Sequence, residues 1–472
     1  MMKKSVIVLF LVMALILVSV ACGGGRVDSV SETGSGSNND SGVSENGEPG
    51  AEKNLITIRG VRSVTGPDAV YEQSVFDPLY SMWAGKINEE GGLFVKALER
   101  KLPIEIEIYD DKSDAEKTVQ LFERVVADEK PDLIFAPGST AAILNCAPLA
   151  QKYDYLLLTA EGSAKELENY LPPYGEYANT YSLLNHSETQ ALALAKILGE
   201  LEVESIYCVY ADDMYGIEYW KATRTALDAI GIRYTDGGSV PPGRDIDADG
   251  IVFSAELSGA DVFLCFTYPD ESVAITKSAV KLEYNPDIYL VGSGGSCDYF
   301  VLSVFGDPDN RPLEGMMALG AWSENSNPFG DERAKEYSRD FRNYWIDQGL
   351  FWKNPDGSLN TAVAENQIVY QDWWSHICGY SALQVLQQAV ENAGSLNEYG
   401  NIDNLALAGY IRDNSFNTVL HPELRFTDNI LSADMYYGNI GQWQNGVFEV
   451  IDADGRGTAE PVYPKPAWLQ RE

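Results

Sequence analysis

From residue 55 onward, hydrophobic stretches with two different periods alternate along the chain. Short apolar or strictly alternating runs, such as 55–61 and 104–110, have the period of β-strands. Longer runs, such as 187–201 and 216–231, have the spacing of amphipathic helices. Repeated strand–helix units predict parallel sheets with helices on both faces. Because there are two such sets, we expect an α/β fold with two domains.

Capping signals mark some helix ends. Asp77 and Pro78 predict an N-cap followed by proline in the first turn, and Gly91 and Gly92 predict the end of that helix. The other helices are expected at 113–129, 140–153, 270–282, 332–349 and 373–393, and the other strands at 132–138, 155–160, 205–212, 260–266, 287–294 and within 435–451.

Ligands of open α/β sheets bind outside the carboxyl ends of the strands. Candidate functional residues are therefore expected just after the strand ends at Val61, Tyr109, Phe135, Leu158, Tyr210, Phe266 and Val291.

The charge excludes two classes of partner. The 472 residues include 34 Lys and Arg against 70 Asp and Glu, a formal net charge of −36. Nucleic-acid binding needs a basic surface, and so does electrostatic docking on anionic lipid. The chain has only 3 histidines, which argues against a His-rich metal site or a His-based catalytic triad. Nucleotide-binding glycine motifs, a Gly-x-Ser-x-Gly elbow and Cys-x-x-Cys do not occur, so an enzyme is the least favoured class.

The N-terminus predicts export. Two lysines precede the apolar run 6–18, which is short for a membrane span, and small residues lead to Cys22. This order resembles a bacterial lipoprotein signal peptide at 1–22, with Cys22 lipidated as the mature N-terminus; the alternative is an uncleaved anchor with a chance cysteine. Residues 23–53 are rich in Gly, Ser and Asn and predict a flexible tether. We expect an extracytoplasmic body, lipid-anchored in the cell envelope.

The other cysteines are odd in number. Exported proteins can form disulfides, but two of these five residues lie in apolar, strand-like runs. Buried free thiols are therefore favoured over a disulfide framework. The five are Cys146, Cys208, Cys265, Cys297 and Cys378.

The loops after the strands resemble one family in order and spacing. They read Ser-Val-Thr-Gly-Pro at 63–67, Asp-Asp at 110–111 and Ala-Pro-Gly-Ser-Thr at 136–140; Asp-Met-Tyr-Gly at 213–216, Thr-Tyr-Pro at 267–269 and Gly-Ser-Gly-Gly at 292–295 follow. The first helix ends in Ile-Asn-Glu-Glu-Gly-Gly at 87–92, which fits the same order. This order is similar to that of the extracytoplasmic solute-binding proteins of ABC transporters, in the branched-chain amino-acid group, over nearly all of residues 55–455.

The resemblance implies the type I periplasmic-binding fold, with two Rossmann-like lobes built on parallel sheets and joined by three crossovers. Lobe one is expected at 55–178 plus 320–425, and lobe two at 179–319 plus 426–472. The crossings are expected near 178–182, 315–322 and 426–434.

The resemblance also implies a ligand site. A ligand carboxylate would meet the hydroxyls and N–H groups at two helix starts, where this chain has Ser139, Thr140 and Ser163; the alternative is that these are ordinary N-caps. Tyr71, Tyr215 and Tyr268 match tyrosines that line the family's cleft, although packing alone would explain them. Trp373 and Trp374 either shape a larger pocket or pack in the core.

One position departs from the family. The acid that binds the ligand's ammonium group is expected in the loop after Val291, where this chain has Gly294. Our hypothesis is that Glu161 supplies this negative charge instead, or that the ligand has no ammonium group. The alternative is a solvated surface glutamate.

A second acidic motif predicts a different ion. Asp245, Asp247, Asp249, Gly250 and Glu256 match the spacing of a calcium loop. No entering helix is expected before this motif, so the alternative is an Asp-rich turn that caps the helix containing residues 253–257. A structural calcium is the one cofactor that the sequence suggests.

Together these features predict the substrate-binding component of an ABC importer. It would capture a small polar solute, an amino acid or an amide, between its lobes and deliver it to permease subunits. The alternative is a ligand sensor that signals to a membrane partner.

Overall fold

The structure is a computed structural model of the full chain. The described residues are 53–66, 69, 72–162, 166–173, 175–184, 187–292, 294–295, 298–305, 313–320, 332–348, 374–432, 435, 440–451 and 457–468. The predicted signal peptide and most of the tether lie outside these ranges. No helix within them is both long enough and apolar enough to cross a membrane.

A first group of strands forms two short sheets whose edge strands are neighbours. In one sheet β1 (Ile56–Arg62) lies between β4 (Ile104–Asp110) and β5 (Leu133–Phe135), all parallel. In the other the order is β13–β14–β7–β6, with β6 (Leu157–Thr159) parallel to β7 (Thr180–Ser182). Strand β6 also contacts β5. The two strands from the end of the chain are β13 (Phe426–Thr427) and β14 (Ile430–Leu431).

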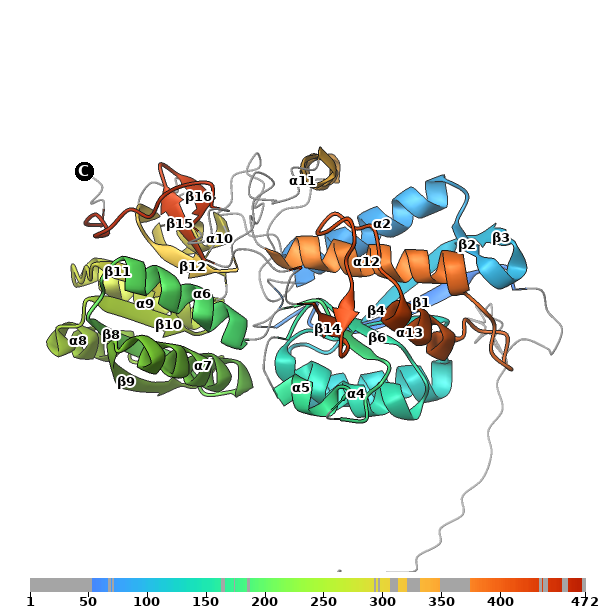
Figure 1. The fold of residues 1–472 in the computed structure, drawn as a ribbon, viewed down its shortest axis with the longest axis horizontal. Coiled ribbons are helices and arrows are strands. Elements are labelled where there is room, and N and C mark those ends of the chain that lie inside the picture. The colour runs from blue at the N-terminus through green and yellow to red at the C-terminus, as the bar shows by residue number, and fades with distance from the viewer. Residues whose placement is uncertain are drawn as a thin grey trace, which may run out of the picture. The chain divides into compact units, whose positions relative to one another are not determined.

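Helices cover both faces of this first group, as Figure 1 shows. On one face an apolar core includes Ile58, Trp83 and Leu386; on the other it includes Val61, Phe122 and Ile143. The first face is covered by η1 (Glu72–Phe76), α2 (Asp77–Glu89), α11 (Glu332–Asp347), α12 (Trp374–Ala393) and α13 (Asn404–Asp413), and the second by α3 (Ala115–Arg124), η3 (Val125–Glu129), α4 (Thr140–Lys152) and α5 (Glu166–Tyr170). A hairpin of β2 (Leu93–Val95) and β3 (Arg100–Leu102), joined by η2 (Lys96–Leu98), follows α2.

The second group is a single sheet of seven strands, in the order β16–β15–β12–β11–β10–β8–β9. The five neighbouring strands β12, β11, β10, β8 and β9 pair in parallel. Strands β15 and β16 add an antiparallel edge beside β12. The strands are β8 (Ser205–Ala211), β9 (Arg233–Val240), β10 (Val262–Phe266), β11 (Ile288–Val291), β12 (Met317–Leu319), β15 (Ile440–Gln444) and β16 (Val447–Val450).

This sheet also has an apolar core on each face. Strand β10 is fully buried, and its residues alternate between the cores: Phe263 and Cys265 belong to one, and Leu264 and Phe266 to the other. The covering helices are α6 (Ser187–Glu200) and α7 (Met214–Ile230) on one face, and α8 (Ala248–Ser258), α9 (Pro269–Lys281) and α10 (Asp298–Phe305) on the other. The two groups confirm the predicted α/β class.

The chain passes between the two groups of strands three times: after β7, after β12 and after β14. Residues 180–182 and 426–431 fall inside the ranges predicted for lobe two, yet their strands belong to the first group. Strand β7 pairs with β6, β14 pairs with β7, and β13 pairs with β14. The side chain of Asn429 bonds the carbonyls of Ala178 and Thr180, each at 2.9 Å, which ties this late segment to β7.

Local signals located several helix ends. Asp114 caps α3 by accepting from the N–H groups of Glu116 and Lys117. The prediction that Asp77 is an N-cap is wrong, because the helical turn η1 runs directly into α2 and Asp77 is already helical. Gly91 and Gly92 follow α2 with φ of 94° and 104°, the left-handed region that favours glycine.

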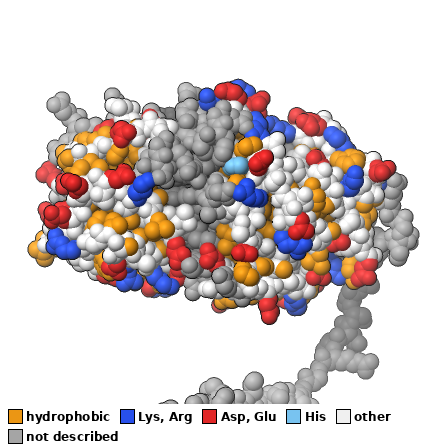
Figure 2. All heavy atoms as spheres, viewed as in Figure 1, with side chains coloured by type: hydrophobic (Ala, Val, Ile, Leu, Met, Phe, Trp, Pro, Cys, Tyr) orange, Lys and Arg blue, Asp and Glu red, His pale blue; other side chains and the backbone are white. Residues whose placement is uncertain are grey.

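Acidic side chains are dispersed over the face drawn in Figure 2, among Lys and Arg side chains. Four cysteines in the described ranges, Cys146, Cys208, Cys265 and Cys378, are buried free thiols, which confirms the prediction for these four. Cys297 lies outside the described residues.

Candidate functional site

The carboxyl ends of β1, β5 and β6 bring several predicted site residues together. Arg62 ends β1, Gly138 and Ser139 follow β5, and Glu161 follows β6. A Cβ atom added to Gly138 would lie 3.5 Å from Glu161 Oε1 and 3.8 Å from Arg62 Nη2. Parallel strands place the loops after them at one edge of the sheet, where ligands of this architecture bind.

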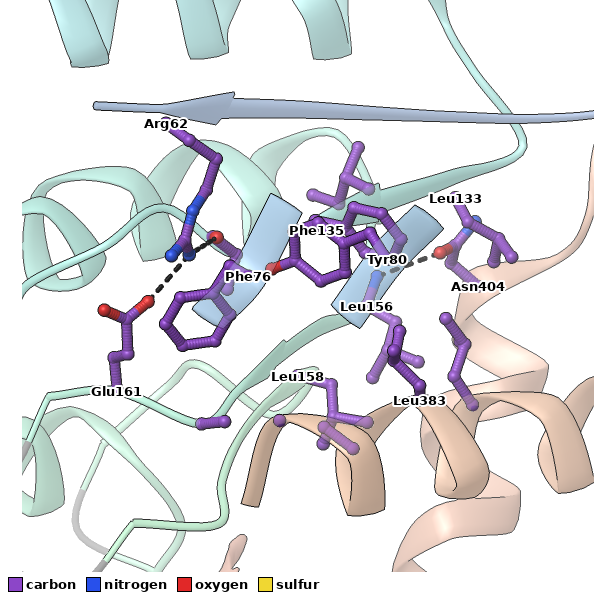
Figure 3. Close-up of a pocket in the computed structure, with 16 residues that line it drawn as sticks. Arg62, Phe76, Tyr80, Leu133, Phe135, Leu156, Leu158, Glu161, Leu383 and Asn404 are labelled. Carbon is purple, nitrogen blue, oxygen red and sulfur yellow. Dashed lines mark hydrogen bonds and ion pairs between the residues drawn. The ribbon is translucent and has the colours of Figure 1, made fainter. Parts of the chain in front are cut away.

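Arg62 is the centre of this edge. Its Nε donates to Glu72 Oε2 at 2.5 Å, and its Nη1 lies 2.7 Å from Glu161 Oε2 and donates to the Ala136 carbonyl at 2.8 Å. The guanidinium carbon lies 4.1 Å from the centre of the Phe76 ring, and Figure 3 shows Arg62 extending toward Glu161 beside that ring. We call Arg62, Glu72 and Glu161 the arginine cluster.

Burial changes the proton affinity of this cluster. Burial raises the pKa of Glu72 from 4.5 to about 7, against the opposing effect of Arg62. Burial also raises the pKa of Glu161, which Arg62 again opposes. For Arg62, burial acts to lower the pKa, but Glu161 and Glu72 outweigh it and hold the guanidinium charged.

The alternative of a solvated surface glutamate at position 161 is therefore wrong. The Glu161 side chain is 15% exposed and is paired with Arg62. Contact with a ligand ammonium stays a prediction, and any such group would share Glu161 with Arg62.

A small cavity adjoins the cluster. Its lining includes Arg62, Glu161, Phe76 and Tyr80, and apolar side chains of β5, β6 and α12. The volume is about 30 Å³, room for about two water molecules. An amino acid does not fit in this volume.

The start of α4 carries two more predicted residues. Ser139 is exposed, and its Oγ accepts from the N–H of Ala142 at 3.3 Å, so it is an N-cap in this structure. Thr140 is 6% exposed. A Cβ atom on Gly162, after β6, would lie 3.7 Å from Thr140 Oγ1, so the loop of Glu161 lies against the first turn of α4. The positions of Ser139 and Thr140 are compatible with both alternatives, helix capping and binding of a ligand carboxylate.

The second sheet has its own set of polar residues at its strand ends. Tyr215 and Tyr268 follow β8 and β10, are partly exposed, and have ring centres 5.3 Å apart. The Tyr268 hydroxyl donates to Asp213 Oδ2 at 2.7 Å. A Cβ atom on Gly292, after β11, would lie 2.5 Å from the Tyr215 hydroxyl oxygen. The structure therefore brings these two tyrosines together, and ligand contact stays a prediction.

Gly294 is buried and has φ of 85°. This left-handed conformation favours glycine and gives a backbone reason for a glycine at the position where the resemblance implied an acid. The next residue is fixed in place, because Trp443 Nε1 donates to the Gly295 carbonyl at 2.8 Å.

Several predicted residues lie outside the described part of the chain. These are Tyr71, Ser163, Cys22 and Trp373; Trp374 begins α12, but its side chain is not described.

The acidic loop has the geometry of a helix cap. Asp247 caps α8 by accepting from the N–H of Gly250 at 3.0 Å. Asp249 turns instead to α9, where Ser278 and Lys281 each donate to it at 2.6 Å. Glu256 lies exposed on α8. The described residues contain no group of three or more His, Cys, Asp or Glu that could hold a metal ion, so calcium binding by Asp245, Asp247, Asp249 and Glu256 stays a prediction without a ligand set.

Sequence reasoning missed Arg62, Glu72 and Asp213. An arginine at the buried end of an apolar strand was a usable signal, because a buried charge needs a partner. Nothing in the spacing identified Glu72 as that partner, ten residues further along.

Comparison with known proteins agrees with the geometry. A model of the family described as "Periplasmic binding protein" matches residues 56–446. A leucine binding protein, LivK, from Thermotoga maritima has a TM-score of 0.65 at 17% identity, over 84% of this chain and 99% of that chain. LivJ from Streptococcus pneumoniae, in complex with isoleucine, has a TM-score of 0.66 at 13% identity, over 84% and 99%.

A curated relative matches over a short part of the chain. The Leu/Ile/Val-binding protein homolog 7 of Brucella abortus is 32% identical over 90 residues, which are 19% of this chain and 22% of that protein. The family match and the shared fold extend over most of the chain. The chain belongs to the periplasmic binding protein family, with the type I fold.

Proposed function

We propose that this protein is the substrate-binding component of an ABC importer and that it captures a small amino acid. The observation that carries the proposal is the pair of polar sets at strand carboxyl ends, one in each group of strands. The first offers a helix start and a carboxylate, Ser139 and Glu161, and the second offers Tyr215 and Tyr268. A ligand held between two such sets would favour closure of one group on the other.

The chemistry of the first set suits a zwitterion. The start of α4 supplies N–H groups and the positive end of a helix dipole for a carboxylate. Glu161 supplies negative charge nearby for an ammonium group. Relatives of the same fold are described as binding leucine and isoleucine, which makes branched-chain amino acids the first candidates.

The test is a thermal-shift screen followed by calorimetry, with leucine, isoleucine, valine, other amino acids, amides, urea and short peptides. A ligand present at 100 times its dissociation constant stabilises the folded chain by about 2.7 kcal/mol, a clear shift. Tyr268→Ala is expected to weaken binding by about tenfold or more, equal to about 1.4 kcal/mol. Tyr234→Ala is the matched control, because Tyr234 lies on β9 and bonds Asp228. If no amino acid raises the melting temperature or binds in calorimetry, the amino-acid proposal is refuted.

We also propose that the protein is anchored outside the cytoplasm by a lipid on Cys22. Cys22 follows the apolar segment 6–18, and the residues after it are a polar tether. Mass spectrometry of the mature N-terminus should find a lipidated cysteine, and Cys22→Ser should release the protein from membranes. A mature chain that keeps residues before Cys22 would contradict this assignment. Delivery to a permease is tested by co-purification and by uptake of the ligand in cells that lack this protein.

A further inference from the structure

The arginine cluster holds two carboxyl groups for one guanidinium. Glu72 and Glu161 both bond Arg62, so with both ionised the cluster has one negative charge in excess. Among the described residues, the other titratable groups that act on it are Tyr80 and Asp77 of α2, and neither brings a positive charge. A buried excess charge is costly unless another positive group arrives.

One oxygen of the cluster has no hydrogen-bond partner in the described part of the chain. Glu72 is 2% exposed, and its Oε1 is buried without a hydrogen-bond partner among the described residues. An unpaired carboxylate oxygen in such a place is expected to take up a proton. Because the two carboxyl groups are coupled through Arg62, the proton belongs to the cluster rather than to one residue.

Glu161 is the member of the cluster that a ligand can reach. Its side chain is 15% exposed, against 2% for Glu72. It lies beside Gly138, directly before the N-cap of α4. A cationic group on a ligand whose carboxylate meets the start of α4 would therefore lie close to Glu161.

We propose that the arginine cluster carries one exchangeable positive charge, which is a proton in the empty protein and the ammonium group of the bound ligand. Binding then releases the proton to solvent. This inference rests on the proposed function, since it assumes a ligand with an ammonium group. The cluster would then give zwitterions a higher affinity than carboxylic acids that lack an ammonium group.

The exchange predicts a specific pH dependence. Because burial raises the pKa of Glu72 to about 7, the proton competes with the ammonium group below that pH. The affinity for leucine should therefore rise as the pH increases from 5.5 to 7, by up to about tenfold per pH unit, and level off above 7. The affinity for 4-methylpentanoate, which lacks the ammonium group, should not rise.

The first experiment needs no ligand. Infrared difference spectra of the empty protein between pH 5.5 and pH 8.5 should contain the C=O stretch of a protonated carboxyl group that titrates near neutrality. This band should be lost or shifted in Glu72→Gln and in Glu161→Gln. It should persist in Glu105→Gln, the matched control, whose side chain is 53% exposed and pairs with Arg59. If no band depends on Glu72 or Glu161, the proposal is overturned.

The second experiment is calorimetry with leucine near pH 7, in buffers of different ionisation enthalpy. We expect a release of about half a proton per leucine, falling toward zero at pH 8.5. Leucine binding with no proton release overturns the exchange but leaves the proposed function intact. If no amino acid binds, both the proposed function and the exchange fail, whereas the infrared band still decides whether the empty cluster holds a proton.

Discussion

Replacing Glu72 with glutamine should remove a pH-dependent loss of stability. Glutamine keeps the shape of a protonated glutamic acid and an acceptor for Arg62 Nε, but it cannot ionise. Arg62 then keeps Glu161 as a charged partner, 2.7 Å away. The variant therefore isolates the effect of the second carboxylate on folding.

The magnitude follows from the shift in proton affinity. Burial raises the pKa of Glu72 from 4.5 to about 7, and each pKa unit equals about 1.4 kcal/mol. Between these values the folded chain holds a proton that the unfolded chain has lost. The stabilisation is fully present below pH 4.5 and is lost as the pH rises through 7, in total about 3 kcal/mol.

Urea denaturation at pH 5, 6, 7 and 8 measures this difference. Glu72→Gln should have nearly the same unfolding free energy as the natural protein at pH 5, and exceed it by up to about 3 kcal/mol at pH 8. Comparing the two proteins at each pH cancels the titration of other groups. The reasoning is refuted if the difference does not change with pH, or if the control Glu105→Gln produces the same change.

Three further predictions concern stability. Ser139→Ala should cost about 1 kcal/mol of unfolding free energy in urea, because α4 loses its N-cap; no loss would argue against that role. Burial lowers the pKa of Lys465 from 10.5 to about 7, so the natural protein should gain stability as the pH rises from 7 to 9. Lys465→Met should flatten this rise in thermal melts, and an unchanged rise would contradict the assignment. Gly216→Ala should lower the unfolding free energy by about 2 kcal/mol or more, because its Cβ would lie 2.3 Å from backbone atoms of Ala211. Gly231→Ala is the comparison: its Cβ would meet open space but its φ is 77°, so it measures the cost of backbone strain without crowding.

The strand–helix alternation was readable because each unit carries its own apolar pattern. The helix expected at 216–231 is α7 at Met214–Ile230, and the strand expected at 260–266 is β10 at Val262–Phe266. Strand β9, at Arg233–Val240, was missed because its sequence is polar and contains two glycines. Its position depends on pairing with β8, which no local pattern encodes.

The candidate site was only partly predictable. Ser139 and Glu161 follow strand ends, so the rule for open sheets identified them. The rule could not show that Glu161 bonds Arg62, or that Tyr268 bonds Asp213, because these contacts join residues 99 and 55 positions apart. The arginine cluster depends on the end of β1, the start of η1 and the loop after β6 meeting at one sheet edge, which sequence spacing does not report.

The late strands have a consequence for how the protein matures. Strand β14 pairs with β7 through Ile430 and Ser182, and the side chain of Tyr181 donates to the Ala408 carbonyl at 2.7 Å. The first group of strands cannot complete these bonds until almost the whole chain has left the ribosome. Contacts this distant in sequence form slowly. An exported chain with this topology would remain incompletely folded, and so accessible to the translocation machinery, until its last segment is available. A chain released from the ribosome before residue 430 would lack the strand that pairs with β7.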